Sequence, residues 1–347
     1  MKPQAGDGAD PEDPRRREIE LSVIIPTRDR LDTLAETLER LVAQKTEIPF
    51  EVIVVDDGST DATVATVRSF AERAPMPVSL AEQPARGPAA ARNRGIAAAR
   101  GRTCLFIGDD TWPRADLVER HGRLHRTRPQ AHAALLGHVA WAPESRPSPF
   151  MEWLNSGVQF EFDQITDPER VPGSCFYTAN VSVKTAFLRA NGGFDESFPN
   201  AAFEDIELGL RLERAGMRLA YDATAVVEHF HPYDLPSSLR RMRTLGRSAV
   251  ILHERVPDWP LPRRPGARHR VKAAVLTALN LVPRVRPLPL RHATWHFLCH
   301  QAFREGCWGV APRGGQAVRL GPILASLAAR DPATRTSIER AACAQRR

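Results

Sequence analysis

Two adjacent carboxylates, Asp109 and Asp110, end a short apolar run in the segment 103–113. The apolar residues 104–107 can fill both faces of a buried parallel strand, and Gly108 lets the backbone turn where the acids leave the sheet. Ligands of open α/β sheets bind at such strand ends. Neighbouring carboxylates repel each other unless a cation or hydrogen-bond donors screen them. The pair therefore indicates a divalent-metal site, and the alternative is a solvated acidic turn.

A second acidic pair, Glu204 and Asp205, opens the segment 203–212, in which apolar residues recur at helical spacing. Carboxylates in the first turn of a helix are stabilised by the helix dipole, so this pair can be purely structural. What the two acidic pairs do therefore depends on the elements that position them.

Strand and helix patterns alternate along residues 19–232. Short β-branched or apolar runs that end in turn residues indicate strands at 21–26, 50–55, 78–80, 104–107, 133–140, 175–183 and 219–227. Apolar residues at helical spacing indicate helices at 32–44, 64–70, 88–100, 116–128, 185–190 and 203–212. This alternation predicts an α/β fold with a mostly parallel open sheet flanked by helices and a Rossmann-like nucleotide-binding half.

The composition is that of a globular protein, because 42% of the 347 residues are hydrophobic and 26% are charged. The length allows one large α/β domain with an appendage. Five scattered cysteines show neither the close pairs of a zinc site nor a disulfide framework, which favours a reducing compartment. Residues 1–18 are polar and charged without an apolar run, so we expect a disordered leader, no signal peptide and a cytoplasmic location.

The net charge of +7 is unevenly distributed. From Tyr233 onward, 21 Arg and Lys residues stand against 6 Asp and Glu residues, so this region carries +15 and residues 1–232 carry −8. We expect helices there at 235–253, 271–281 and 293–306, and the apolar stretch 271–282 is too short to span a membrane. This surface can lie on an anionic membrane, peripherally at its inner face, or its aromatic residues can pack the extension onto the rest of the chain. Packing is the favoured interpretation, and nucleic acid is not expected as a partner.

Several sequence elements, in this order, resemble the motifs of family 2 inverting glycosyltransferases with the GT-A fold. They are VIIPTRDR at 23–30, VVDDGSTD at 54–61, ARNRG at 91–95, IGDD at 107–110, GGFDE at 192–196 and FED at 203–205. The resemblance covers residues 19–232. It implies a catalytic GT-A domain at 19–232, between the leader that the composition predicts at 1–18 and the basic, mainly helical extension at 233–347. It also implies transfer of a sugar from a nucleotide-sugar donor to a hydroxyl of a glycan, lipid-linked or small-molecule acceptor.

The resemblance assigns the donor nucleotide to side chains near the first strands. It implies that Asp57 pairs with the base and that Asp109 lies near the ribose. The other candidates for nucleotide binding are Pro26, Thr27, Arg28, Asp29 and Asn93. Many relatives have an aromatic residue at the position of Arg28, but a guanidinium can also stack on a base. The structural alternative for Asp57 is a helix cap, which is the favoured interpretation of Asp61.

The resemblance also implies a divalent ion, Mg²⁺ or Mn²⁺, with Asp110 as its direct ligand. The usual Asp-x-Asp signature is present here as Gly108-Asp109-Asp110, so its first acid is missing. Such ions bind through one or two carboxylates together with phosphate oxygens and water, so a small number of protein ligands is adequate. His229 resembles a histidine that completes the metal site in some relatives, and the alternative is an imidazole at the edge of the core. His231 is a weaker candidate.

The expected general base is Asp205, which would accept the proton of the acceptor hydroxyl while the sugar transfers with inversion. Glu204 is the second candidate, and a helix-dipole role for both acids is the structural alternative. Two other function classes stay open. A nucleotidyltransferase would normally have a Gly-rich loop after the first strand, which 26–30 lacks. A nucleotide-sugar-binding protein without transfer activity would share the donor site.

Overall fold

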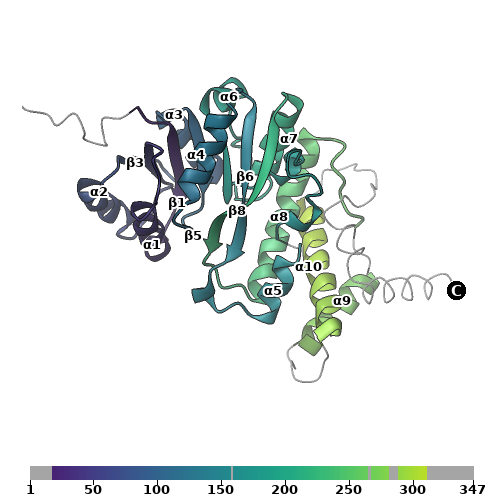
Figure 1. Ribbon diagram of the computed structural model, residues 1–347. Coiled ribbons are helices and arrows are strands. Elements are labelled where there is room, and N and C mark those ends of the chain that lie inside the picture. Colours follow the sequence, from purple (N-terminus) through teal and green to yellow (C-terminus); the bar gives the residue numbers. More distant parts are fainter. Residues whose placement is uncertain (1–17, 158, 265–266, 281–287, 311–347) are drawn as a thin grey trace, which may run out of the picture.

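The computed structural model describes residues 18–157, 159–264, 267–280 and 288–310. The expected leader, except Glu18, lies outside these residues, as does the end of the expected C-terminal extension, 311–347. The described chain forms a curled sheet flanked by helices, and three C-terminal helices stand together beside it (Figure 1).

The elements follow the chain in the alternating order that the sequence predicts. The strands are β1 (Leu21–Thr27), β2 (Phe50–Asp56), β3 (Val78–Glu82), β4 (Thr103–Ile107), β5 (Thr111–Pro113), β6 (Ala133–Trp141), β7 (Asn180–Lys184) and β8 (Arg218–His229). The α-helices are α1 (Leu31–Val42), α2 (Thr63–Arg73), α3 (Pro88–Ala98), α4 (Leu117–Thr127), α5 (Pro149–Asn155), α6 (Thr185–Ala190), α7 (Glu204–Arg214), α8 (Leu235–Arg255), α9 (Ala267–Asn280) and α10 (Leu288–Val310).

The described strands form one sheet in the order β3-β2-β1-β4-β7-β6-β8-β5. The strands β3, β2, β1 and β4 run parallel, so the carboxyl ends of β1, β2 and β4 lie at one edge. The strand β7 is antiparallel to β4 and β6, β6 is parallel to β8, and β5 is antiparallel to β8. The predicted α/β fold is confirmed. The sheet is fully parallel in its N-terminal half and mixed in the other half.

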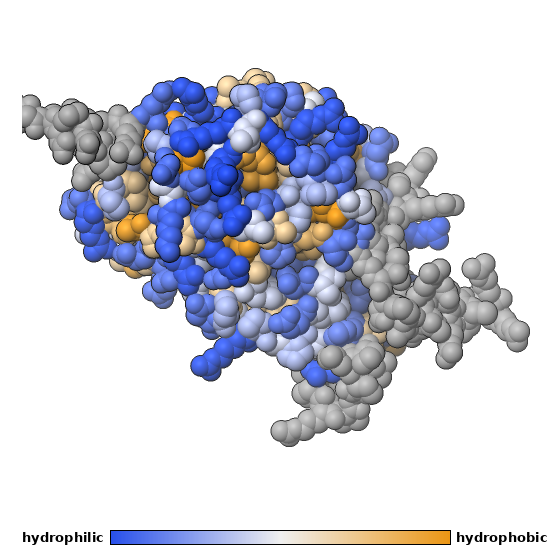
Figure 2. Space-filling view, in the orientation of Figure 1, coloured by the Kyte–Doolittle hydropathy of each residue, from blue (hydrophilic) through white to orange (hydrophobic). Residues whose placement is uncertain are grey.

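Alternate side chains of β1 point to opposite faces of the sheet, and helices cover both faces. Val23 and Ile25 belong to the core on the side of α1, and Ile24 belongs to the core on the side of α3. A strand covered on both faces needs the continuous apolar run that the sequence shows. Gly95 of α3 lies so close to this strand that a Cβ there would be 2.4 Å from Ile24 Cγ2. On the face shown in Figure 2, hydrophilic residues predominate and hydrophobic residues form small separate patches.

The strand predicted at 175–183 is shorter than expected, because β7 begins only at Asn180. The residues before it form a 3₁₀ turn, Gly173–Cys175, which packs closely against α7. A Cβ on Gly173 would lie 2.4 Å from the carbonyl oxygen of Gly209. The sequence also gave no indication of the three-residue strand β5 or of α5, whose N-cap Ser148 accepts a hydrogen bond from the Met151 backbone N–H.

The C-terminal helices pack against the sheet domain through aromatic side chains. Trp295 of α10 contacts Phe150 and Trp153 of α5, with ring centroids 5.1 and 5.7 Å apart. The helices α8 and α10 lie side by side (Figure 1), and a Cβ on Gly246 would be 2.1 Å from the Phe303 carbonyl oxygen. Packing therefore accounts for Trp295. Among the described residues, none of the helices combines the length and the hydropathy that a bilayer span requires.

Two histidines of α4 are buried against β7. His121 lies 2.7 Å from Ser182 Oγ through Nδ1 and 3.0 Å from Asn180 Oδ1 through Nε2, and His125 Nε2 lies 2.8 Å from the same Ser182 Oγ. Burial lowers the pKa of His121 to about 4. Burial and the charge of Lys184 also hold the pKa of His125 well below its usual range. Both imidazoles are therefore neutral in the folded protein at neutral pH.

We expect the His121→Asn/His125→Asn double variant to lose less stability in acid than the wild-type protein. Both pKa values are lower in the folded than in the unfolded chain. The contribution of the two neutral imidazoles to the free energy of unfolding is therefore complete above about pH 6.5 and is lost as the pH falls toward about 4. Urea unfolding at pH 7.5 and pH 5 measures this loss. The two proteins should differ in it by on the order of 4 kcal/mol, about 2 kcal/mol for each histidine. Equal losses would contradict the burial of two neutral imidazoles.

Candidate active site

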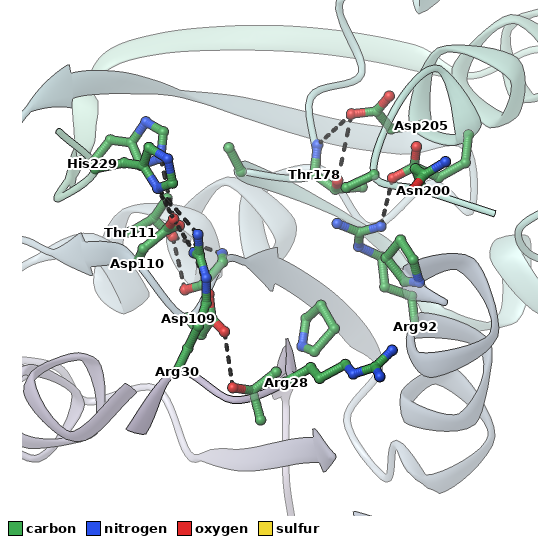
Figure 3. A pocket seen from close by; sticks show the side chains of 18 of the residues that line it. Arg28, Arg30, Arg92, Asp109, Asp110, Thr111, Thr178, Asn200, Asp205 and His229 are labelled. Atoms are coloured by element: carbon green, nitrogen blue, oxygen red, sulfur yellow. Dashed lines mark hydrogen bonds and ion pairs between the residues drawn. The ribbon is translucent and has the colours of Figure 1, made fainter. Parts of the chain in front are cut away.

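The carboxyl ends of β1, β2 and β4 open into a cleft of about 620 Å³. Asp109 and Asp110 lie on one side of it and Asp205 on the other (Figure 3). The parallel strands explain why the residues that follow β1, β2 and β4 lie in one cleft, because groups that follow neighbouring parallel strands gather at one sheet edge. The sequence-predicted site residues that line the cleft are Pro26, Thr27, Arg28, Asp57, Asp109, Asp110, Glu204, Asp205 and His229.

Two predicted nucleotide-binding residues do not line this cleft. The Asp29 carboxylate accepts hydrogen bonds from the Thr60 backbone N–H at 2.6 Å and the Thr60 hydroxyl at 3.0 Å. Asn93 donates to the Phe194 carbonyl oxygen and to Glu196 Oε1, both at 2.9 Å, and accepts from the Phe194 N–H at 2.8 Å. Asp29 thus connects two loops at the strand ends, and Asn93 holds the loop that precedes α7.

Asp57 is held at the cleft by three N–H donors. Its Oδ1 accepts hydrogen bonds from Gln83 Nε2 and from the Arg86 backbone N–H, both at 2.8 Å, and its Oδ2 accepts from the Gly87 N–H at 2.9 Å. A carboxylate oxygen can accept two hydrogen bonds, so Oδ2 keeps capacity for a ligand. The donors belong to the connection between β3 and α3, and Asp57 therefore does not cap α2. Asp61 is the residue next to that helix start, where it accepts from the Thr63 N–H at 3.0 Å.

The carboxylates of Asp109 and Asp110 share one guanidinium. Arg30 Nη1 lies 3.2 Å from Asp109 Oδ1 and also contacts Asp110 Oδ2 closely. The Thr27 hydroxyl donates to Asp109 Oδ2 at 2.8 Å. Burial and the charge of Asp110 raise the pKa of Asp109 to about 6. Burial alone would also raise the pKa of Asp110. Interactions with His229, His231 and Arg30 nevertheless hold that pKa well below its usual range.

Two imidazoles complete a candidate metal centre around Asp110. His229 Nε2 lies 3.4 Å and His231 Nδ1 lies 3.3 Å from Asp110 Oδ2. One ligand atom from each of the three residues falls within 4.8 Å of the other two. The His229 ring stacks on Trp141 with centroids 5.3 Å apart, which fixes its orientation. A carboxylate with two imidazoles is a donor set that fits a divalent ion.

The acidic pair at the start of α7 divides into one anchored and one accessible carboxylate. Glu204 is buried, and its Oε1 accepts from Arg92 Nη1 at 2.7 Å while its Oε2 accepts from the Ala202 N–H at 2.5 Å. Burial and the charge of Asp205 raise the pKa of Glu204 to about 7, although Arg92 opposes the rise. Asp205 is half-buried and faces the cleft, where its Oδ2 lies 3.4 Å from the Thr178 N–H nitrogen and hydroxyl oxygen.

The structure adds cleft residues that the sequence pattern did not single out. They are Arg30, Arg92, Gln159, Thr178, Tyr233 and Arg241. Arg30 and Arg92 stand inside motifs that carried the resemblance, beside the predicted site residues Asp29 and Asn93, and this proximity was the available signal. Gln159 and Thr178 come from the irregular middle of the chain, Tyr233 from the loop before α8 and Arg241 from α8, and no spacing indicated a site at these positions.

Comparison with known proteins agrees with this geometry. Residues 22–150 match the model of the family described as glycosyl transferase family 2. A validoxylamine A glucosyltransferase of Streptomyces hygroscopicus subsp. jinggangensis is 30% identical in an alignment of 228 positions that covers 57% of this chain and 52% of that protein. A pre-mycofactocin glycosyltransferase of Mycobacterium tuberculosis is 30% identical in an alignment of 268 positions that covers 73% of this chain and 51% of that protein. The chain thus spans about half the length of these curated relatives.

A solved structure supports the same assignment of the fold. The mannosyltransferase PcManGT from Pyrobaculum calidifontis, in complex with GDP-Man and Mn²⁺, is similar with a TM-score of 0.52 and 20% sequence identity. The match covers 95% of this chain and 86% of that chain. The sequence motifs, the strand order and the family match confirm the predicted resemblance. This chain therefore carries a domain of glycosyl transferase family 2, built on the GT-A fold.

Proposed function

We propose that the protein is a glycosyltransferase that moves a sugar from a nucleotide-sugar donor to a hydroxyl of an acceptor, with inversion at the anomeric carbon. The observation that carries the proposal is the meeting of three acidic groups in one cleft. These are Asp57, the pair Asp109 and Asp110, and Asp205. The relatives compared above are glycosyltransferases, which supports the same reaction class.

In this proposal the donor lies along the strand ends. The Asp57 carboxylate accepts an N–H of the base, and Arg28, whose side chain is 54% exposed, stacks on the base or lies beside it. Asp109 and the Thr27 hydroxyl, which are already 2.8 Å apart, hold the ribose. This arrangement leaves the diphosphate near Asp110.

We place a divalent ion at Asp110, His229 and His231. When bound, the ion neutralises negative charge that grows on the departing diphosphate. Imidazole ligands suit a transition-metal ion such as Mn²⁺ better than Mg²⁺, because Mg²⁺ is a hard ion that prefers oxygen ligands. The solved relative that binds GDP-Man also contains Mn²⁺. Arg30 contacts Asp110 on the same side, so its guanidinium has to move when a cation binds.

Asp205 is the proposed general base. The acceptor oxygen forms a bond to the anomeric carbon while the bond between that carbon and the diphosphate oxygen breaks, and the hydroxyl proton passes to the Asp205 carboxylate. Attack from the face opposite the leaving group inverts the configuration. Thr178 orients the carboxylate from one side, and the Glu204–Arg92 pair fixes the start of the helix below it.

The experiment that tests this function is release of nucleoside diphosphate from a panel of nucleotide sugars in the presence of Mn²⁺. Release shows that the bond at the anomeric carbon breaks, which binding alone does not show. A protein that only binds nucleotide sugars would protect the donor instead. A nucleotidyltransferase would release pyrophosphate from a nucleoside triphosphate.

We propose that the chain consists of a leader at 1–18, a catalytic domain at 19–232 and an extension at 233–347. For its location, we propose that the protein is cytoplasmic and contacts an anionic membrane peripherally through α9. Val271 and Val275 are 64% and 52% exposed on this helix, and Arg268 and Lys272 are exposed beside them. An apolar ridge flanked by basic residues suits a membrane surface with acidic lipids.

We expect the Arg268→Glu/Lys272→Glu double variant to bind anionic vesicles roughly 30-fold more weakly than the wild-type protein, since each basic residue near such a surface contributes about 1 kcal/mol. Co-sedimentation with phosphatidylglycerol vesicles at low and high salt measures the effect. The Arg94→Glu protein, changed at an exposed position on α3, is the matched control. Equal co-sedimentation with neutral and anionic vesicles would exclude the membrane contact.

A further inference from the structure

A smaller chamber of about 180 Å³ adjoins the cleft. Asp205, Tyr233 and Arg241 line both the chamber and the cleft, so the two spaces meet at the proposed base. A molecule in the chamber would therefore face a donor in the cleft across the Asp205 carboxylate.

One face of α8 forms a wall of this chamber. Ser238, Arg241, Met242 and Leu245 line it, and their spacing of three, four and seven positions is that of one helical face. The other apolar lining residues are Leu154, Phe160, Phe203 and Ile206, and Gln159, Glu161 and Tyr177 add polar groups. Apolar side chains of this kind stabilise the face of a ring, and the polar groups can pair with its substituents. The lining thus favours a ligand with an apolar ring face and a polar edge.

Ser238 is a buried polar residue on the α8 wall of the chamber. Its side chain is 2% exposed, and its Oγ has no hydrogen-bond partner among the described residues. Buried hydroxyl groups are normally hydrogen-bonded, so an unpartnered one on the wall of the chamber is available to a polar group of a ligand.

The volume limits the size of that ligand. A cavity of about 150 Å³ lined by Leu, Ile and Phe side chains is large enough to bind benzene. The chamber of about 180 Å³ therefore has room for one six-membered ring with a small substituent. It is too small to enclose a second sugar together with a long hydrocarbon chain.

We propose that this chamber binds the acceptor, and that the acceptor hydroxyl is carried by a single apolar ring, as in a phenol or a benzyl alcohol. This inference rests on the proposed function and names its acceptor class. The ring lies against Met242 and Leu245, and Ser238 forms a hydrogen bond with a polar substituent. The reacting hydroxyl points to Asp205, its oxygen bonds to the anomeric carbon, and its proton passes to that carboxylate as the diphosphate leaves.

The test uses 4-hydroxybenzyl alcohol and methyl β-glucoside as probes of the full chain, with binding measured by saturation-transfer NMR and calorimetry. The ring probe should bind and methyl β-glucoside should not. Met242→Trp, which fills the chamber, should weaken binding of the ring probe at least tenfold, and Ser238→Ala should weaken it severalfold. The matched control is Arg240→Trp, which places the same side chain at an exposed position of α8 outside the chamber, and it should bind the probe normally.

A parallel titration with GDP and UDP in the presence of Mn²⁺ separates this inference from the proposed function. Nucleotide binding without binding of the ring probe, or ring binding that Met242→Trp leaves unchanged, would overturn the acceptor assignment alone. Ring binding without any nucleotide binding would overturn the acceptor assignment together with the proposed function. Retained nucleotide binding in Ser238→Ala and Met242→Trp shows that both variants are folded.

Discussion

Asp205→Asn is expected to lower the rate of sugar transfer by roughly 10²–10⁴-fold, the usual cost of losing a positioned general base. Asn has nearly the same size as Asp but cannot accept a proton at neutral pH. The carboxylate is half-buried and its contacts to Thr178 are long, at 3.4 Å, so the substitution disturbs few structural interactions. Turnover and donor affinity should be measured separately, and the loss should fall on turnover.

Glu204→Gln is the matched variant, because it changes the neighbouring carboxylate on the same helix. The Glu204 side chain is buried and forms an ion pair with Arg92. Its replacement leaves the buried guanidinium without a counter-charge, so we expect mainly a loss of stability of roughly 3 kcal/mol. Thermal unfolding of both variants separates stability from catalysis. Near-normal turnover in Asp205→Asn, with lost turnover in a folded Glu204→Gln protein, would move the base to Glu204. Full activity in both would make the pair structural.

Asp110→Asn is expected to remove the dependence of nucleotide binding on a divalent ion. The Asp110 carboxylate is the group that His229 and His231 both face, and an amide is a much weaker ligand for such an ion. In calorimetric titrations with GDP and UDP, we expect the affinity in Mn²⁺ to fall at least about 100-fold, to the level that the wild-type protein shows with a chelator.

Thr224→Ala serves as the control for this prediction, because Thr224 is an exposed residue of β8 that does not line the cleft. It should bind nucleotide as the wild-type protein does. If Asp110→Asn retains the full effect of Mn²⁺, the metal has to bind elsewhere, and Arg30 becomes the cation that faces the diphosphate. Unchanged nucleotide affinity of the wild-type protein after addition of a chelator would likewise contradict a metal site at Asp110.

The strand ends explain which parts of the site the sequence could reveal. Asp57, Asp109 and Asp110 each follow a short buried strand, and parallel strands bring such positions to one sheet edge whatever the details of packing. Their place in the cleft could therefore be predicted from local sequence. Asn93 stands between the same motifs, but its side chain turns to the loop at Phe194, which depends on how that loop folds back.

Other parts of the site depend on contacts that no local pattern contains. Glu204 and Asp205 are neighbours in sequence, and only the position of α7 against Arg92 decides which carboxylate is buried. Arg30 reaches Asp110 across 80 positions of the chain, and His231 joins it from the far end of the sheet. The chamber beside Asp205 exists because α8 packs across the cleft, and the basic composition of that region gave no sign of it.

The most direct test of the central claim is release of nucleoside diphosphate from nucleotide sugars by the full chain with Mn²⁺, compared with the Asp205→Asn and Asp110→Asn proteins. The account predicts release from at least one donor by the wild-type protein, faster when an acceptor is present, and strongly reduced release by both variants. Tight binding of a nucleotide sugar with no release under any acceptor condition, or equal release by all three proteins, would contradict it.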